Sequence, residues 1–178
     1  MKISLNWLTD YVDVSLPTGE LAGVFKRIGL PVEEVIATDT DVVLDLEVTS
    51  NRPDCLGHLG VARELAAATG KQFNPPQIGT LPASGRTSEL TSIEVLAPDL
   101  CPRYTARVIC GVKVGPSPAW MVERLEAVGM RSINNVVDAT NYVLMEYSQP
   151  LHSFDYDKLE GRRIVVRRAA GGEVLVSI

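Results

Sequence analysis

A proline- and glycine-rich stretch beginning at Asn74 divides the chain and constrains its fold more than any other feature. Asn74-Pro75-Pro76 opens this stretch, and four more turn-forming residues follow: Gly79, Pro82, Ser84 and Gly85. Proline lacks a backbone N–H and glycine lacks a Cβ, so such a run interrupts helices and strands. In a chain of 178 residues it predicts two small domains, 1–74 and 92–178, joined by a linker over 75–91.

The two parts also differ in charge. Residues 1–84 carry 6 Lys and Arg against 11 Asp and Glu, whereas residues 85–178 carry 11 of each. The overall charge of −5 gives no broad positive surface for nucleic acid. With 46% hydrophobic and 22% charged residues the chain is typical of a folded globular protein, and no apolar run approaches the ~20 residues of a membrane span. We therefore expect a cytoplasmic protein without membrane contact.

Hydrophobic periodicity predicts helices and a strand in the first part. Apolar residues at helical spacing predict a helix capped by Thr18 and ended by Gly29. Alternation over 42–48 predicts a half-buried strand. A second helix is expected from Pro53 to Gly70.

The second part contains both strand-like and helix-like segments. Strand composition occurs over 93–96 and 103–114, and helices are predicted over 117–128 and 135–147. The last segment, 163–178, resembles a hairpin around a Gly-Gly turn. These patterns predict an α+β fold of two small mixed domains, the second of them incomplete because its last expected strand runs to the final residue.

Most catalytic and metal-binding motifs are absent from the sequence. There is no glycine-rich phosphate loop, no Gly-x-Ser-x-Gly elbow and no His-Glu-x-x-His motif. The three cysteines, Cys55, Cys101 and Cys110, are odd in number and form no Cys-x-x-Cys pair. We expect no disulfide framework and no metal site.

Uncharged polar residues gather near the predicted helix over 135–147. Asn135, Asp138 and Tyr142 lie at positions i, i+3 and i+7 and share one helix face, with Asn134 at its mouth. Such a face can hold a polar ligand. Equally, Asn134 and Asn135 can cap the helix while Asp138 interacts with the positive end of its dipole, and this alternative needs no ligand.

His152 is the one candidate for acid–base chemistry. It follows Pro150 on a locally extended segment, and Asp155, three residues on, could fix its tautomer. A neutral imidazole there could orient a water molecule or accept its proton. A structural role is the alternative, because no nucleophile partner can be named. His58 is expected at the surface or at the edge of the core.

Several stretches resemble motifs of the bacterial phenylalanyl-tRNA synthetase beta subunits, in the same order along the chain. They are Met1–Leu8 with Tyr11-Val12, Ile28–Glu33, Asn51–Leu56 with Gly60–Glu64, and Ile133–Tyr142 with Gln149–Asp155. The resemblance covers nearly the whole chain.

This resemblance implies part of a class II synthetase that joins phenylalanine to its tRNA using ATP and magnesium. In the family an alpha subunit carries the synthetic site within an (αβ)₂ heterotetramer, and the beta subunit contributes assembly surfaces, tRNA contacts and an editing site. The family's editing histidine corresponds to His152. The resemblance further implies a substrate pocket near five residues: Arg131, Asn134, Asn135, Asn141 and Asp155.

Two departures from the family pattern shape the expectation. Many relatives insert an OB-fold tRNA-binding domain where this chain has only residues 37–41, and the family's editing domain continues beyond Ile178. We therefore expect a piece of a longer beta subunit that binds no cofactor itself and cannot edit alone. The alternatives are a stand-alone RNA-binding or assembly module without catalysis and, less favoured, an independent hydrolase centred on His152 and Asp155.

Overall fold

A computed structural model describes residues 1–176, and the chain in it forms two compact units. The first combines Met1–Ile78 with Val114–Ser153, and the second combines Gly79–Lys113 with the segment that starts at Phe154. Both units contain helical turns and strands, which confirms the mixed α+β class. The units cut the chain at positions other than the expected domain boundaries, because residues 114–153 pack with the first unit rather than with the residues on either side of them.

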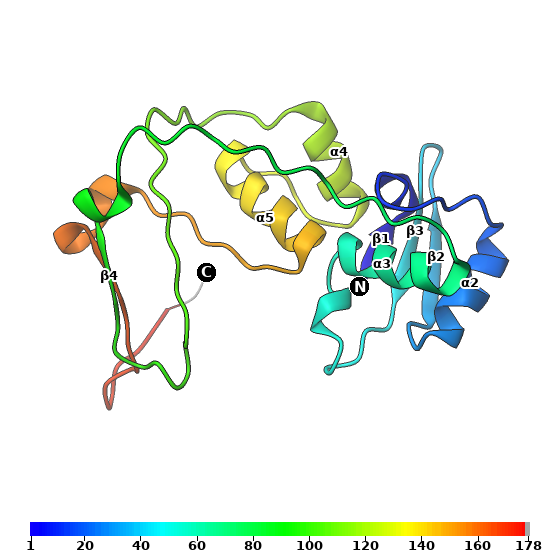
Figure 1. The fold of residues 1–178 in the computed structure, drawn as a ribbon, viewed down its shortest axis with the longest axis horizontal. Helices are drawn as coiled ribbons and strands as arrows, with labels where there is room; N and C mark the ends of the chain where they lie inside the picture. The colour runs from blue at the N-terminus through cyan, green and yellow to red at the C-terminus, as the bar shows by residue number, and fades with distance from the viewer. Residues whose placement is uncertain (177–178) are drawn as a thin grey trace. The chain divides into compact units, whose positions relative to one another are not determined.

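A three-stranded antiparallel sheet forms the centre of the first unit (Figure 1). Its strands are β1 (Lys2–Ser4), β2 (Val32–Ala37) and β3 (Val42–Leu46), in the order β1-β3-β2. Strand β3 is therefore central, and its Val43, Leu44 and Leu46 are buried. The alternating pattern predicts a buried face with Leu44 and Leu46, but it places Val43 on the other face. The sequence patterns did not predict strand β2, and most of its residues are exposed.

The first helical pattern is confirmed in α2 (Thr18–Arg27), which follows the short helix α1 (Leu5–Leu8). Apolar residues at helical spacing bury one face of α2, and Gly29 ends it with a φ of 81°. The expected cap is wrong, since Pro17 occupies the N-cap position and Thr18 is the first helical residue.

The second helix begins later than the sequence indicates. Residues Pro53–Cys55 form a 3₁₀ turn η1, Gly57 is extended, and α3 runs over His58–Thr69 before ending at Gly70. Ala62 and Ala66 of the predicted apolar stripe are buried, whereas Leu56, which precedes α3, is exposed although the pattern assigned it to the stripe.

Two helices from later in the chain complete the core of the first unit. They are α4 (Ala119–Ala127) and α5 (Asn135–Tyr147), and α5 has the bounds that the sequence predicts. The shared core contains apolar side chains from all five helices and from the sheet, among them Trp7, Leu21, Phe25, Leu44, Leu65, Leu125 and Met145. The chain thus leaves the first unit and returns to finish its core.

Through residue 176, the second unit holds one short parallel strand pair, β4 (Ser92–Val95) with β5 (Arg163–Val166). Three single 3₁₀ turns accompany it: η2 (Thr87–Glu89), η3 (Tyr156–Lys158) and η4 (Glu160–Arg162). The predicted strand over 93–96 is confirmed. The strand expected over 103–114 is wrong, because the structure gives these residues no regular element.

The hairpin expected over 163–178 is also not formed in the described residues. Its first strand exists as β5 but pairs with β4 from seventy residues earlier, and residues 173–176 are not a strand. The end of the expected second strand, residues 177–178, lies outside the described residues. Within residues 1–176, none of the helices is long and apolar enough to cross a membrane.

Candidate functional site

Asp138 organises the polar segment that leads into α5. Its carboxylate is fully buried and accepts hydrogen bonds from the hydroxyls of Ser117 (2.5 Å) and Ser132 (2.6 Å) and from the backbone N–H of Ile133 (2.9 Å). Burial alone raises the pKa of Asp138, but these donated hydrogen bonds outweigh it and hold the pKa below the usual value. Asp138 therefore joins three chain segments as a carboxylate.

Asn134 and Asn135 both make structural contacts at the start of α5. The Oδ1 atom of Asn134 accepts from the backbone N–H groups of Val136 (3.0 Å) and Val137 (3.1 Å), so Asn134 is the N-cap. The Oδ1 atom of Asn135 accepts from the N–H of Gly115 at 3.1 Å. The capping alternative holds for Asn134, whereas Asn135 is the first helical residue and its side chain bonds to Gly115 instead of capping. A role of either residue in substrate binding stays a prediction.

The other residues of the predicted pocket are dispersed. Arg131 is exposed and Asn141 is half-buried within α5. His152 is exposed on the extended segment that follows α5. Asp155 belongs to the second unit, where its side chain caps η3 by accepting from the N–H of Asp157 at 3.2 Å. The first unit holds the other five of the six predicted residues.

A stack of aromatic rings joins the two chain segments that make up the first unit. The sequence patterns did not predict it. Trp7 lies between His58 and Tyr142, with ring centroids 4.0 Å and 4.6 Å apart and near-parallel planes. The guanidinium of Arg124 lies 5.4 Å from the Trp7 ring centroid and donates to the Tyr142 hydroxyl at 2.9 Å. These contacts fix α4 and α5 to the amino-terminal residues.

His58 is completely buried, and the expectation of a surface or core-edge position is wrong. Its Nε2 accepts from the backbone N–H of Ser4 at 3.1 Å, so Nδ1 must carry the proton that it donates to the carbonyl of Met145 at 2.8 Å. Burial lowers the pKa of His58 to about 4. His58 is thus a neutral imidazole with both nitrogens hydrogen-bonded.

A polar chain continues from the stack toward the end of α5. Trp7 donates from Nε1 to the Tyr11 hydroxyl at 3.0 Å, and that hydroxyl donates to the carboxylate of Glu146. Burial, followed by this contact with Glu146, raises the pKa of Tyr11 well above its usual value, and burial raises that of Glu146. All described buried side-chain polar atoms have a hydrogen-bond partner, which is typical of a structural network.

Charged residues around η1 form a second network. Arg52 donates to Asp54 from Nε and Nη2, both at 3.0 Å, and Arg63 donates to the same carboxylate at 2.7 Å. The guanidinium of Arg52 also contacts Glu64 at 3.1 Å. The hydrogen bonds from Arg52 are the main reason that the pKa of Asp54 is lowered to about 2.

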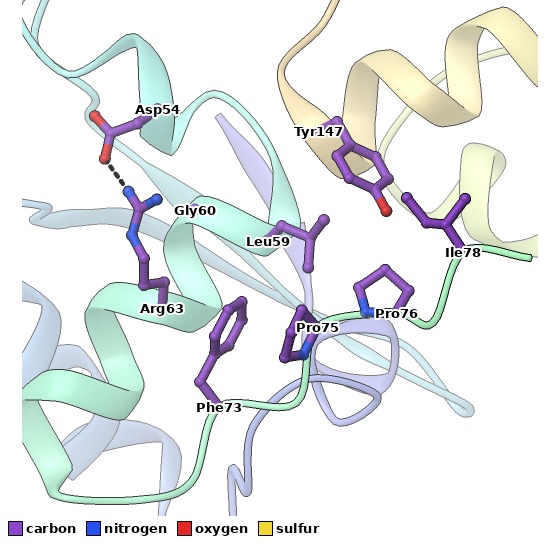
Figure 2. A pocket seen from close by; sticks show the side chains of 9 residues that line it. All are labelled: Asp54, Leu59, Gly60, Arg63, Phe73, Pro75, Pro76, Ile78 and Tyr147. Carbon is purple, nitrogen blue, oxygen red and sulfur yellow. Dashed lines mark hydrogen bonds and ion pairs between the residues drawn. The ribbon is translucent and has the colours of Figure 1, made fainter.

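A surface cleft of about 370 Å³ lies beside this network (Figure 2). Figure 2 shows the Asp54–Arg63 ion pair at one end and Tyr147 with Ile78 at the other. Apolar side chains line most of the remainder: Leu59, Phe73, Pro75 and Pro76. None of the six predicted site residues lines the cleft.

Cysteines and metal-binding groups provide no further site in the part of the chain that the structure describes. Cys55, Cys101 and Cys110 are free thiols, and burial raises the pKa of Cys55 to about 12. Residues 1–176 contain no group of three or more His, Cys, Asp or Glu side chains that could hold a metal ion.

Comparison with known proteins gives a consistent result. Residues 100–178 match the family described as the B3/4 domain. The chain is 49% identical over all 178 residues to the "Phenylalanine--tRNA ligase beta subunit" of Rhodopirellula baltica. This match covers 100% of this chain and 26% of that protein.

Two further relatives carry the same name. The protein of Moorella thermoacetica is 56% identical over 140 residues, 78% of this chain and 17% of its own length. That of Geobacter sulfurreducens is 52% identical over 151 residues, 85% of this chain and 19% of its own length. The chain therefore spans about a quarter or less of the length of these relatives.

Proposed function

This chain belongs to the family of phenylalanine–tRNA ligase beta subunits, and from that premise we propose that it serves in a synthetase that attaches phenylalanine to its tRNA. The observation that carries the proposal is identity of about one residue in two along the full chain. An alpha subunit is the proposed partner in an (αβ)₂ heterotetramer, tRNA is the proposed nucleic-acid ligand, and the cytoplasm is the proposed location.

The specific activity that we propose for this region is hydrolysis of tyrosine wrongly attached to the tRNA. An apolar pocket shaped for phenylalanine cannot strongly reject a near-isostere with one extra hydroxyl, so a second, hydrolytic site is needed for accuracy. All six predicted site residues lie within the stretch that matches the B3/4 domain, residues 100–178.

His152 is the residue that we propose for the hydrolytic step. Ester hydrolysis requires a water molecule oriented toward the carbonyl carbon and a group that can take its proton. An exposed imidazole on the segment after α5 is accessible to a large tRNA substrate, in contrast to His58, the only other histidine, which is fully buried. Arg131 and the nearby asparagines are proposed to bind the aminoacyl end, and Asp155 is proposed to orient His152.

ATP and magnesium are proposed to bind elsewhere in the assembly. The sequence has no glycine-rich phosphate loop, and the described residues hold no cluster of metal-binding side chains. Adenylate formation and transfer are proposed for the alpha subunit, and this chain alone is proposed to have neither synthetase activity nor editing activity.

The test replaces His152 by Ala in the full beta subunit assembled with its alpha subunit. Hydrolysis of tyrosyl-tRNA should fall by at least about 100-fold, the usual contribution of a positioned acid–base group, while phenylalanine charging stays unchanged. Glu160→Ala, at an exposed position eight residues away, is the matched control and should leave both activities intact. Hydrolysis at the wild-type rate in the His152 variant would reject the editing role, and a parallel loss of charging would indicate a general structural defect.

A further inference from the structure

The last turn of α5 is held by residues from the start of α3. The final carbonyl groups of a helix have no partner inside the helix. The carbonyl of Met145, in that last turn, accepts from Nδ1–H of His58 at 2.8 Å. Ser148 then ends the helix in the left-handed region with a φ of 59°, and its N–H donates to the Leu144 carbonyl at 3.0 Å. A left-handed serine is uncommon and indicates that neighbouring contacts fix this turn.

The backbone of Gly57 also packs closely against the last turn of α5. A Cβ atom at this position would lie 2.7 Å from the backbone nitrogen of Ser148 and 2.9 Å from the carbonyl oxygen of Glu146, which is closer than real Cβ atoms come. Gly57 has an extended φ of −157°, which any residue can adopt. Its lack of a side chain is therefore required by the approach of α5 and by nothing in its own conformation.

The direction of the segment after α5 depends on where this turn ends. Only Gln149, Pro150 and Leu151 separate Ser148 from His152, and the proline ring fixes one of the backbone angles between them. A shift or rotation of the last turn of α5 therefore displaces His152 as well, because the short connection absorbs little of the movement.

We infer that His58 and Gly57 are positioning residues that set the end of α5 and thereby the placement of His152 for hydrolysis. This inference rests on the proposed editing function. His58 itself touches no substrate, since it is buried beneath Trp7 and bonded on both nitrogens. A misplacement of about 1 Å at a reacting group can reduce a rate by as much as 100-fold, so such a contact is able to control activity from a distance.

The two hydrogen bonds of His58 can be separated by substitution. The side-chain amide of Asn places an N–H donor near the position of Nδ1, and that of Gln places an acceptor oxygen near the position of Nε2. His58→Asn therefore retains the bond to Met145 at the end of α5, and His58→Gln retains the bond to Ser4 in the sheet. Both variants lose the stack on Trp7, so their difference compares loss of the bond to α5 with loss of the bond to Ser4.

The experiment measures steady-state hydrolysis of tyrosyl-tRNA by the assembled synthetase carrying His58→Gln, His58→Asn or Gly57→Ala. We expect kcat to fall about tenfold in the Gln and Gly57→Ala variants with KM within about twofold, and to stay within about threefold of wild type in the Asn variant. Leu21→Ala is the matched control for general destabilisation, because Leu21 is a buried residue of α2, a helix that lies apart from α5 within the first unit (Figure 1).

Phenylalanine charging by the same preparations checks that each variant is assembled. Equal hydrolysis by the Asn and Gln variants would overturn the inference, and so would a loss of equal size in Leu21→Ala. Gly57→Ala leaves the imidazole unchanged and tests the same contact if His58→Gln does not assemble, so normal hydrolysis by that variant would also refute it. His152→Ala, measured alongside, separates the two proposals, because normal hydrolysis there rejects the editing function itself.

Discussion

Acidification should weaken the first unit through His58, and the effect can be calculated from its surroundings. The imidazole is fully buried, and burial, with the nearby Arg124 charge in support, lowers its pKa from 6.5 to about 4, against the opposing effect of the bond to the Met145 carbonyl. In the unfolded chain the same ring has its ordinary pKa.

The sign follows from which state binds the proton. Between pH 6.5 and pH 4 the unfolded chain binds a proton at His58 and the folded unit does not, so the free energy of unfolding falls as the pH falls through this window. The contribution is fully present above pH 6.5 and is lost by pH 4. A shift of this size corresponds to about 3 kcal/mol over the whole window and to about 2 kcal/mol between pH 7 and pH 5.

Urea unfolding followed by tryptophan fluorescence measures the effect. Both tryptophans, Trp7 and Trp120, belong to the first unit and report on it selectively. The wild-type chain is compared at several pH values with His58→Asn, which does not titrate in this range. Carboxylates with lowered pKa values, such as Asp54 and Asp138, are present in both chains and cancel in the difference.

The expected result is a wild-type stability that declines more steeply than that of the variant, by about 2 kcal/mol between pH 7 and pH 5. The variant is less stable than wild type at pH 7, and the two curves converge as the pH falls. Parallel curves over this range would refute the reasoning, since they would mean that the folded unit protonates His58 as readily as the unfolded chain.

Two further substitutions, each paired with a control, test packing in the first unit. Asp138→Ala should destabilise the first unit by about 3 kcal/mol in urea unfolding, because Ser117, Ser132 and the Ile133 N–H lose a buried acceptor, whereas exposed Asp157→Ala should change stability by less than about 0.5 kcal/mol. Gly60→Ala should cost about 3 kcal/mol or more, because its Cβ would lie 1.7 Å from the Asp54 carbonyl oxygen. Gly23→Ala in α2 has room for the methyl group and should be neutral or stabilising by up to about 1 kcal/mol, so equal effects at the two glycines would contradict the close-contact argument.

The features that the sequence predicted well depend on neighbouring residues. Helix α5 has its expected bounds because Asn134 caps it and Pro150 prevents its continuation, and both signals lie within three residues of the helix. Gly29 and Gly70 likewise end their helices with positive φ angles. Local steric rules and capping bonds suffice for such boundaries.

The features that the sequence did not predict depend on distant partners. His58 is buried because Trp7 and Met145, 51 and 87 residues away, close around it, and no periodicity on α3 encodes those contacts. Strand β5 pairs with β4 rather than with residues 173–176, the described residues beyond its Gly-Gly turn, since parallel pairing joins segments that are far apart in the chain. The apolar residues of 103–114 have strand composition, but a strand also requires a partner, which propensity does not supply.

The candidate site shows the same division. Local reasoning offered capping by Asn134 as an alternative to ligand binding, and the structure gives Asn134 that contact. For Asp138 it offered only the helix dipole, whereas the structure buries the carboxylate against Ser117, Ser132 and the Ile133 N–H. The Gly57–His58 contact with the end of α5 had no local signal. The importance of Gly57 and His58 is visible only in the structure, where the last turn of α5 packs against them.

The return of α4 and α5 to the first unit has a consequence during synthesis on the ribosome. Trp7 needs Tyr142 to complete its burial, yet 78 residues separate the end of α3 at Thr69 from the end of α5 at Tyr147. At a typical elongation rate of 5–20 residues per second, the amino-terminal sheet and its helices wait roughly 4–16 s with one apolar side uncovered. During that interval the nascent chain presents Trp7 to whatever binds exposed aromatic surface, so the first unit matures only after α5 has been translated through Tyr147.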